Sequence, residues 1–169
     1  IKKTDRKDVE KMLRRLQVEG ELPESRCLSR EERMLRSISR ERSDVSKNKR
    51  KLMVRIHAVI DSHDLPSVKA EFVKPEWRSR MEAALRPDEW LVLEMQLSQY
   101  DHALGVIGLL DQRMIEMASQ SPYYALLMSI PGMGPVLSSI VIAEVGRMQD
   151  FKDARQFAAF IGLVPRVRS

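Results

Sequence analysis

The sequence predicts an all-α fold in which two long helices precede a small helical domain. Apolar residues recur at alternating spacings of three and four through residues 35–59 and again through about 88–119. Beyond residue 120 the apolar runs are short, and no stretch of the chain shows the sustained alternation of a strand. The long helices can pair with each other as an antiparallel hairpin or with their copies in another subunit, and periodicity alone does not decide between the two.

The first helix is expected over residues 4–19, where Thr4 or Asp5 can cap the N-terminus and Gly20 ends the helix. It is amphipathic, because four apolar side chains recur at helical spacing. These side chains are Val9, Met12, Leu13 and Leu16.

The first long helix is expected to begin near Ser29, because Ser29 followed by Glu32 forms a capping-box pattern. Its seam has eight positions, of which six are apolar. The charged occupants, Arg42 and Lys49, weaken this coiled-coil-like seam and can face a partner in place of a second helix. The eight occupants are Leu35, Ile38, Arg42, Val45, Lys49, Leu52, Ile56 and Val59.

Residues 61–89 contain three prolines, which predict a turn followed by short helical pieces. The second long helix has a seam of the same kind, with one charged member, Asp111. Short helices are then expected over about 122–130, 135–146 and 152–161. The seam residues of the second long helix are Leu93, Leu97, Tyr100, Leu104, Ile107, Asp111, Met114 and Ala118.

The positive charge of the chain is concentrated in one block. The formal net charge is +5, and residues 30–55 hold ten Lys and Arg against four Asp and Glu. Such a block indicates a polyanionic partner such as nucleic acid, or alternatively a solvated helix face. Cys27 is the only cysteine, which excludes an internal disulfide and a thiolate zinc site and favours a reducing, cytoplasmic setting. No apolar run approaches the roughly 20 residues of a membrane span.

The stretch "SIPGMGPVLSS" places two of the seven glycines, Gly132 and Gly134, between two apolar runs. A short helix, the turn "PGMG" and a helix starting at Pro135 together form a helix-hairpin-helix pattern. Its free N–H groups would lie at a helix N-terminus, where they can hold a phosphate of DNA without contacting a base. The alternative is an ordinary tight turn between two packed helices.

Two further groups of residues are candidates for chemistry. Asp5 and Asp8 are three residues apart, so on a helix both carboxylates project from one face and can share Mg²⁺; the alternative is that they favour the helix N-terminus electrostatically. Near the other end, the guanidiniums of Arg166 and Arg168 can clamp a phosphate. Ser169 has no neighbouring base in the sequence that would activate it as a nucleophile.

Taken in order, "KKTDRKD", "KNKRKLMVRIHAVI" and "LLMSIPGMGPVLSSIVIAEVGRMQDFKDARQFAAFIGLVPRVRS" resemble the insertion-sequence transposases of the DEDD type. This group includes the Piv-like DNA invertases and the bridge-RNA-guided recombinases. The resemblance covers most of the chain and is weakest across about 61–119. It implies that an α/β resolvase-like domain precedes the helices in the full-length protein, with two further acids lying upstream of Ile1.

The resemblance divides the chain into three parts: the end of the catalytic domain (1–25), a long coiled-coil region with the basic block (26–120) and a truncated transposase domain (121–169). It implies that Asp5 and Asp8 contribute to a Mg²⁺ site and that Ser169, or the residue after it, attacks a backbone phosphate. It also implies a homo-dimer or tetramer and, in some members, a guide RNA.

For this chain we therefore expect binding to DNA, through Gly132, Gly134, Arg166 and Arg168 together with basic residues of the first long helix. The chain by itself is expected to bind nucleic acid without cutting it. An alternative of a different class is a non-catalytic DNA-binding or scaffold protein, and a third is a helical structural subunit whose basic block is merely solvated. The candidate basic residues are Arg42, Lys47, Lys49, Arg50, Lys51 and Arg55.

Overall fold

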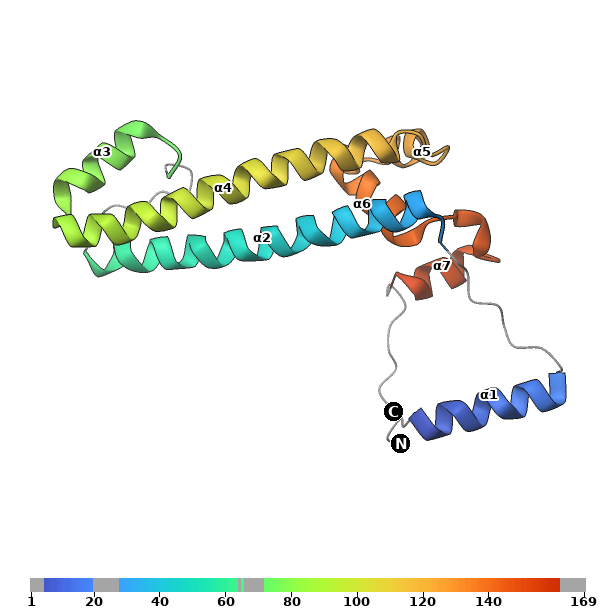
Figure 1. Cartoon of the computed structure of the whole chain (residues 1–169). Coiled ribbons are helices and arrows are strands. Elements are labelled where there is room, and N and C mark those ends of the chain that lie inside the picture. Colours follow the sequence, from blue (N-terminus) through green and yellow to red (C-terminus); the bar gives the residue numbers. More distant parts are fainter. Residues whose placement is uncertain (1–4, 20–27, 64, 66–71, 162–169) are drawn as a thin grey trace.

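A computed structural model of the chain describes residues 5–19, 28–63, 65 and 72–161, and in these ranges it is helical with no strand, as the sequence predicts. The three longest of these helices lie within the first 118 residues (Figure 1). The elements are α1 (Asp5–Glu19), α2 (Arg30–Ser62), α3 (Pro75–Ala84), α4 (Pro87–Ala118), α5 (Tyr124–Met128), α6 (Pro135–Val145), the 3₁₀ helix η1 (Met148–Asp150) and α7 (Ala154–Phe160).

Local sequence signals set the ends of the long helices. The predicted capping box is confirmed at the start of α2, where Glu32 N donates to Ser29 Oγ at 3.1 Å and Ser29 N donates to the Glu32 carboxylate at 2.8 Å. Pro75 and Pro87 each stand in the first turn of a helix, where a missing N–H costs nothing. At the start of α4, hydrogen bonds from the side chain and backbone N–H of Arg86 lower the pKa of Glu89 to about 2.

Helices α2 and α4 lie side by side as an antiparallel hairpin (Figure 1). All sixteen predicted seam positions are buried or half-buried, so each seam faces the other helix within one chain. The two charged side chains Arg42 and Asp111 form an ion pair, with 2.6 Å between Arg42 Nε and Asp111 Oδ1. Arg42 therefore faces α4, which answers the alternative that it faces a partner.

The hairpin has a separate hydrophobic core at each end. At the connection between the long helices, α3 covers the hairpin, and Trp77 packs against Phe72 with 5.2 Å between ring centroids. At the open end, α5 and α6 pack against α2 and α4 around the fully buried Met114. The first core consists of Ile56, Ile60, Phe72, Trp77, Met81, Leu85, Leu93, Leu97 and Tyr100, and the second of Leu35, Met114, Ala118, Leu127, Ile142 and Ala143.

The short helices differ from prediction mainly in length. Helix α5 covers five residues where nine were expected, and α7 begins at Ala154, after Asp153 caps it by accepting from Gln156 N at 2.7 Å. The 3₁₀ turn η1 was not predicted, because three residues carry no periodic signal. No helix in the described ranges has both the length and the apolar character of a membrane span. The three-part division of the chain stays a prediction.

Candidate nucleic-acid interface

The two glycines of the "PGMG" turn have different structural roles. Gly132 has φ +86°, the left-handed region that favours glycine, although a Cβ there would meet no atom within 4 Å. Gly134 has an ordinary extended backbone (φ −84°, ψ 175°) and is the N-cap of α6. The backbone of the turn therefore requires glycine at position 132, whereas Gly134 leaves the start of α6 without a side-chain cap.

The turn has a packed side and an exposed side. Met133 and Val136 pack against the second core, as the tight-turn interpretation requires. Gly132 and Gly134 are exposed, and Leu137 in the first turn of α6 is 45% exposed. Pro135 itself contributes no N–H. Because no side chain caps this end of α6, the amides that follow Pro135 in the first turn remain open to an anion. The arrangement can hold a phosphate, and core packing does not compete with that role.

The basic block of α2 is divided between contacts within the chain and an exposed face. Lys47, Arg50, Lys51 and Arg55 recur at helical spacing and are all exposed. Among the described residues, only Lys47 of these four has an ion pair, at 2.8 Å to Asp44, and such exposed pairs contribute little. We refer to these four residues as the outer basic face; they can neutralise phosphates along a nucleic-acid backbone.

The remaining two candidates on α2 lie elsewhere. Arg42 forms an ion pair with Asp111, and Lys49 occupies a half-buried seam position. Arg42 and Lys49 are seven residues apart, about two helical turns, so both side chains lie on the side of α2 that faces α4. Contact of Arg42 and Lys49 with nucleic acid stays a prediction, but their positions favour the outer basic face as the principal contact on this helix.

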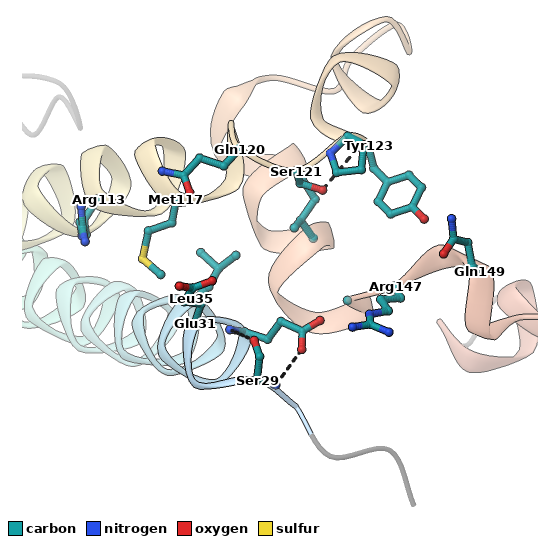
Figure 2. A pocket seen from close by; sticks show the side chains of 14 residues that line it. Ser29, Glu31, Leu35, Arg113, Met117, Gln120, Ser121, Tyr123, Arg147 and Gln149 are labelled. Atoms are coloured by element: carbon teal, nitrogen blue, oxygen red, sulfur yellow. Dashed lines mark hydrogen bonds between the residues drawn. The ribbon is translucent and has the colours of Figure 1, made fainter.

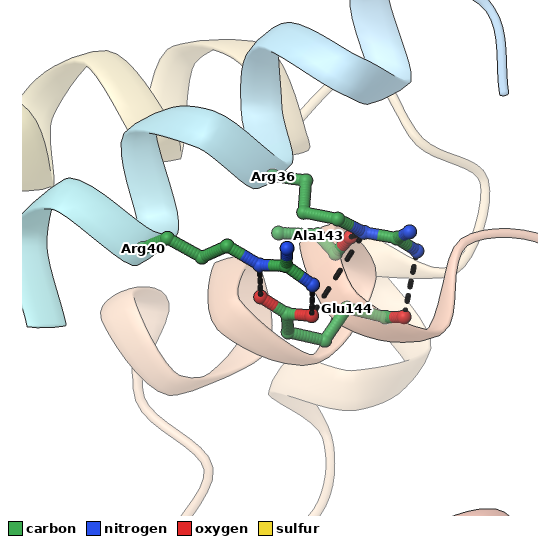
Figure 3. A network of polar contacts seen from close by, with 4 residues as sticks. All are labelled: Arg36, Arg40, Ala143 and Glu144. Atoms are coloured by element: carbon green, nitrogen blue, oxygen red, sulfur yellow. Dashed lines mark hydrogen bonds and ion pairs between the residues drawn. The ribbon is translucent and has the colours of Figure 1, made fainter. Parts of the chain in front are cut away.

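Two arginines at the start of the block attach α6 to α2 (Figure 3). Arg36 donates from Nε to the carbonyl of Ala143 at 3.1 Å and from Nη2 to the carbonyl of Glu144 at 2.9 Å. Arg40 donates to both carboxylate oxygens of Glu144 at 3.2 Å each. Arg36 thus satisfies carbonyls at the C-terminal end of α6, where the helix dipole favours a cation. We call this network the α2–α6 clamp.

Sequence reasoning missed the α2–α6 clamp. Arg36 and Arg40 belong to the basic block, but their partners lie more than 100 positions away in sequence. The clamp holds α6 beside residues 36–40, and the outer basic face lies further along α2. From Arg40 to Lys51 is roughly 16 Å along the helix axis. The structure therefore places the glycine turn and the outer basic face at separate positions, the first before α6 and the second on α2.

Asp5 and Asp8 both lie in the first turn of α1, which begins at Asp5. Asp8 is half-buried. Among the described side chains, no three His, Cys, Asp or Glu residues gather in a way that could hold a metal ion. Two carboxylates alone supply too few ligands for six-coordinate Mg²⁺, so the described residues do not complete such a site. Arg166, Arg168 and Ser169 lie outside the described residues.

Comparisons with known proteins match the C-terminal part of the chain to a transposase family. Residues 124–169, which include α5, the turn and α6, match the model of the Transposase IS116/IS110/IS902 family. A protein of Pseudomonas aeruginosa named as a family 20 transposase is 46% identical over 43 residues, which are 25% of this chain and 13% of that protein. One of Sinorhizobium fredii named as a transposase (y4pF/y4sB) is 33% identical over 71 residues, covering 42% and 18%.

These similarities support an insertion-sequence transposase family for the C-terminal part of the chain. The chain spans less than a fifth of the length of either relative. No solved structure is significantly similar to it.

Proposed function

We propose that this chain is part of the DNA transposase or site-specific recombinase of a mobile insertion sequence. The proposal rests on one observation. The segment that matches the transposase family also contains the glycine turn, which is exposed and is followed by a helix, α6, that no side chain caps. In this proposal the turn acts as a helix-hairpin-helix element that binds a DNA phosphate, and the outer basic face binds a second part of the backbone.

The chemical step that we propose is strand cleavage and rejoining. Ser169, or the residue after it, would attack a backbone phosphate and form a phosphoserine ester with the DNA while the bond from phosphorus to one deoxyribose oxygen breaks and that oxygen leaves as a hydroxyl. Rejoining is the reverse exchange, in which a deoxyribose hydroxyl attacks the ester and releases the serine. Arg166 and Arg168 would hold the phosphate oxygens. Asp5 and Asp8 would contribute to binding Mg²⁺, which supplies charge stabilisation at the phosphate, together with acids from elsewhere in the protein. A guide RNA would meet the same salt-sensitive contacts as DNA, because the outer basic face binds phosphate and not bases.

Replacing Asp8 by Ala in the protein that carries this chain tests the enzyme proposal. We expect recombination of an insertion-sequence substrate to be lost while DNA binding is retained, because Asp8 belongs to neither hydrophobic core. Glu10→Ala, on a different side of the same helix, is the control. Recombination that survives Asp8→Ala would instead favour the non-catalytic binding or scaffold protein.

We also propose that two copies of the chain associate through the outer face of α4. Leu91, Met95 and Leu109 on this face are 56%, 57% and 70% exposed. Gly105 and Gly108 lie in the same helix with nothing within 4 Å of an added Cβ, so packing within the chain does not require them. Exposed glycines in a helix cost stability, and their absence of side chains allows another helix to approach closely. Positions 91, 95, 98, 102, 105 and 109 hold no Asp, Glu, Lys or Arg, so two identical faces can pair without like-charge repulsion.

The double change Gly105→Ala and Gly108→Ala is expected to have opposite effects on stability and association. Each substitution removes a helix-interior glycine and should stabilise the folded chain by about 0.5–1 kcal/mol. The added methyl groups should keep a second helix away and weaken self-association in sedimentation velocity. Ser43→Ala on the exposed side of α2 is the control for a simple gain in helix propensity. Unchanged association in the double variant would exclude this face as the interface.

A further inference from the structure

A pocket of about 650 Å³ lies at the open end of the hairpin, at the opposite end of α6 from the glycine turn (Figure 2). Its floor is apolar and comes from three elements: Leu35 of α2, Met117 of α4 and Ile142 of α6. Leu35 and Ile142 belong to the second core and are 7% and 8% exposed, so the floor is rigid. The volume is within the range of pockets that hold small ligands.

The rim of the pocket is polar and largely without partners. Figure 2 shows Tyr123 and Gln149 on one side and Gln120 on the other, and Arg147 also lines the pocket. Within the described ranges, the side chains of these four residues and of Glu31 form no hydrogen bond or ion pair. An apolar floor with polar groups around it fits a flat ligand that has hydrogen-bonding edges.

The first turn of α2 also borders the pocket, but it is not a binding site for an anion. Two of its amides, Ser29 N and Glu32 N, are already engaged by the capping box. Glu31 adds a negative charge beside them. Arg147 is therefore the cation of the pocket that is available to a phosphate, since Arg113 is paired with Glu116 at 3.1 Å.

We infer that this pocket holds a single unstacked nucleobase that carries an exocyclic amine: adenine, cytosine or guanine. The Tyr123 ring offers a stacking surface, and the amides of Gln120 and Gln149 can both donate to and accept from a base edge. The Glu31 carboxylate only accepts hydrogen bonds, so it favours the amine of adenine, cytosine or guanine over thymine, which has no amine. Arg147 would bind the phosphate of the same nucleotide.

This inference rests on the proposed function, because an unpaired base reaches the pocket only if the chain binds nucleic acid. The glycine turn and the outer basic face are proposed to contact only the phosphate backbone of the nucleic acid, whereas the pocket would contact a base. The pocket and the outer basic face lie on different parts of α2, so their contributions can be measured separately.

The test measures binding of the 169-residue chain to a set of DNA duplexes by fluorescence anisotropy. One duplex is fully paired, and the others carry a one-nucleotide bulge of adenine, cytosine, guanine or thymine, or an abasic site. We expect the adenine, cytosine and guanine bulges to bind more than tenfold more tightly than the abasic bulge, since one base stacked on an aromatic ring contributes roughly tenfold by itself. Thymine, which stacks but offers Glu31 no amine, should bind more tightly than the abasic bulge and more weakly than the other three. These comparisons need no variant.

Substitutions then assign the effect to the pocket. Tyr123→Ala should abolish most of the preference for a bulged base over an abasic site, whereas Tyr123→Phe keeps the ring and should retain most of it. Gln149→Ala should reduce the preference, and Gln99→Ala, an exposed glutamine on α4 outside the pocket, should not. Circular dichroism checks that each variant is folded.

A titration with deoxyadenosine monophosphate separates the two proposals. If the paired duplex does not bind but the nucleotide does, and Tyr123→Ala removes that binding, the pocket is supported and the proposed function is not. If the paired duplex binds but all bulges bind equally and the nucleotide does not bind, the pocket assignment is wrong. If neither binds, both proposals are wrong.

Discussion

Replacing Lys47, Arg50, Lys51 and Arg55 together by glutamine is expected to weaken binding of the chain to duplex DNA by roughly 10³-fold at 0.1 M salt. All four side chains are exposed, and none is held by more than a surface ion pair. Each neutralised phosphate contributes about 0.9 to the slope of log K against log salt concentration, so the slope should fall by about 3.6. Affinities measured at several salt concentrations give both quantities.

The matched control removes the same number of positive charges from α1. Lys7, Lys11, Arg14 and Arg15 are exposed on that helix, and their replacement by glutamine lowers the net charge equally. An equal loss of affinity in the α1 variant would show that net charge, and not the outer basic face of α2, accounts for binding. Affinity of the unchanged chain that does not depend on salt would favour the solvated structural subunit.

Arg36→Ala is expected to lower the free energy of unfolding by about 2 kcal/mol, because it removes charge-assisted hydrogen bonds to two carbonyls at the end of α6. The Arg36 side chain is 24% exposed, so water replaces its contacts only in part. For a chain of this size the midpoint of thermal unfolding should fall by about 4–8 °C. Differential scanning calorimetry measures this change directly.

Arg40→Ala is the comparison within the α2–α6 clamp. The Arg40 side chain is 65% exposed and contacts only the carboxylate of Glu144, so we expect a much smaller loss of stability. Equal effects of the two substitutions would mean that the ion pairs with Glu144, and not the carbonyl contacts of Arg36, attach α6 to α2. Loss of the clamp should also reduce binding at the glycine turn, since α6 would then be held beside α2 by core packing alone.

Those parts of the candidate site that depend on residues close together in sequence could be predicted. The positive φ of Gly132 and the proline at the start of α6 follow from turn and cap chemistry within a few residues, and the outer basic face follows from helical spacing. Arg42 illustrates the limit. Its charge marked it as a nucleic-acid contact, but it pairs with Asp111, 69 positions away. Arg42 is one of two charged residues in its seam and Asp111 is the charged residue of the other, and sequence periodicity does not show that these two meet.

The sequence by itself determined the helices of this protein: their ends at capping residues and prolines, and which face of each long helix is apolar. Those properties depend on neighbours within one or two turns. Only the tertiary structure decided that α2 and α4 pair within one chain, that Arg36 holds the end of α6, and that Tyr123, Arg147 and Gln149 surround one pocket. These contacts join residues far apart in sequence, and they form because the packing of the two cores brings the elements together.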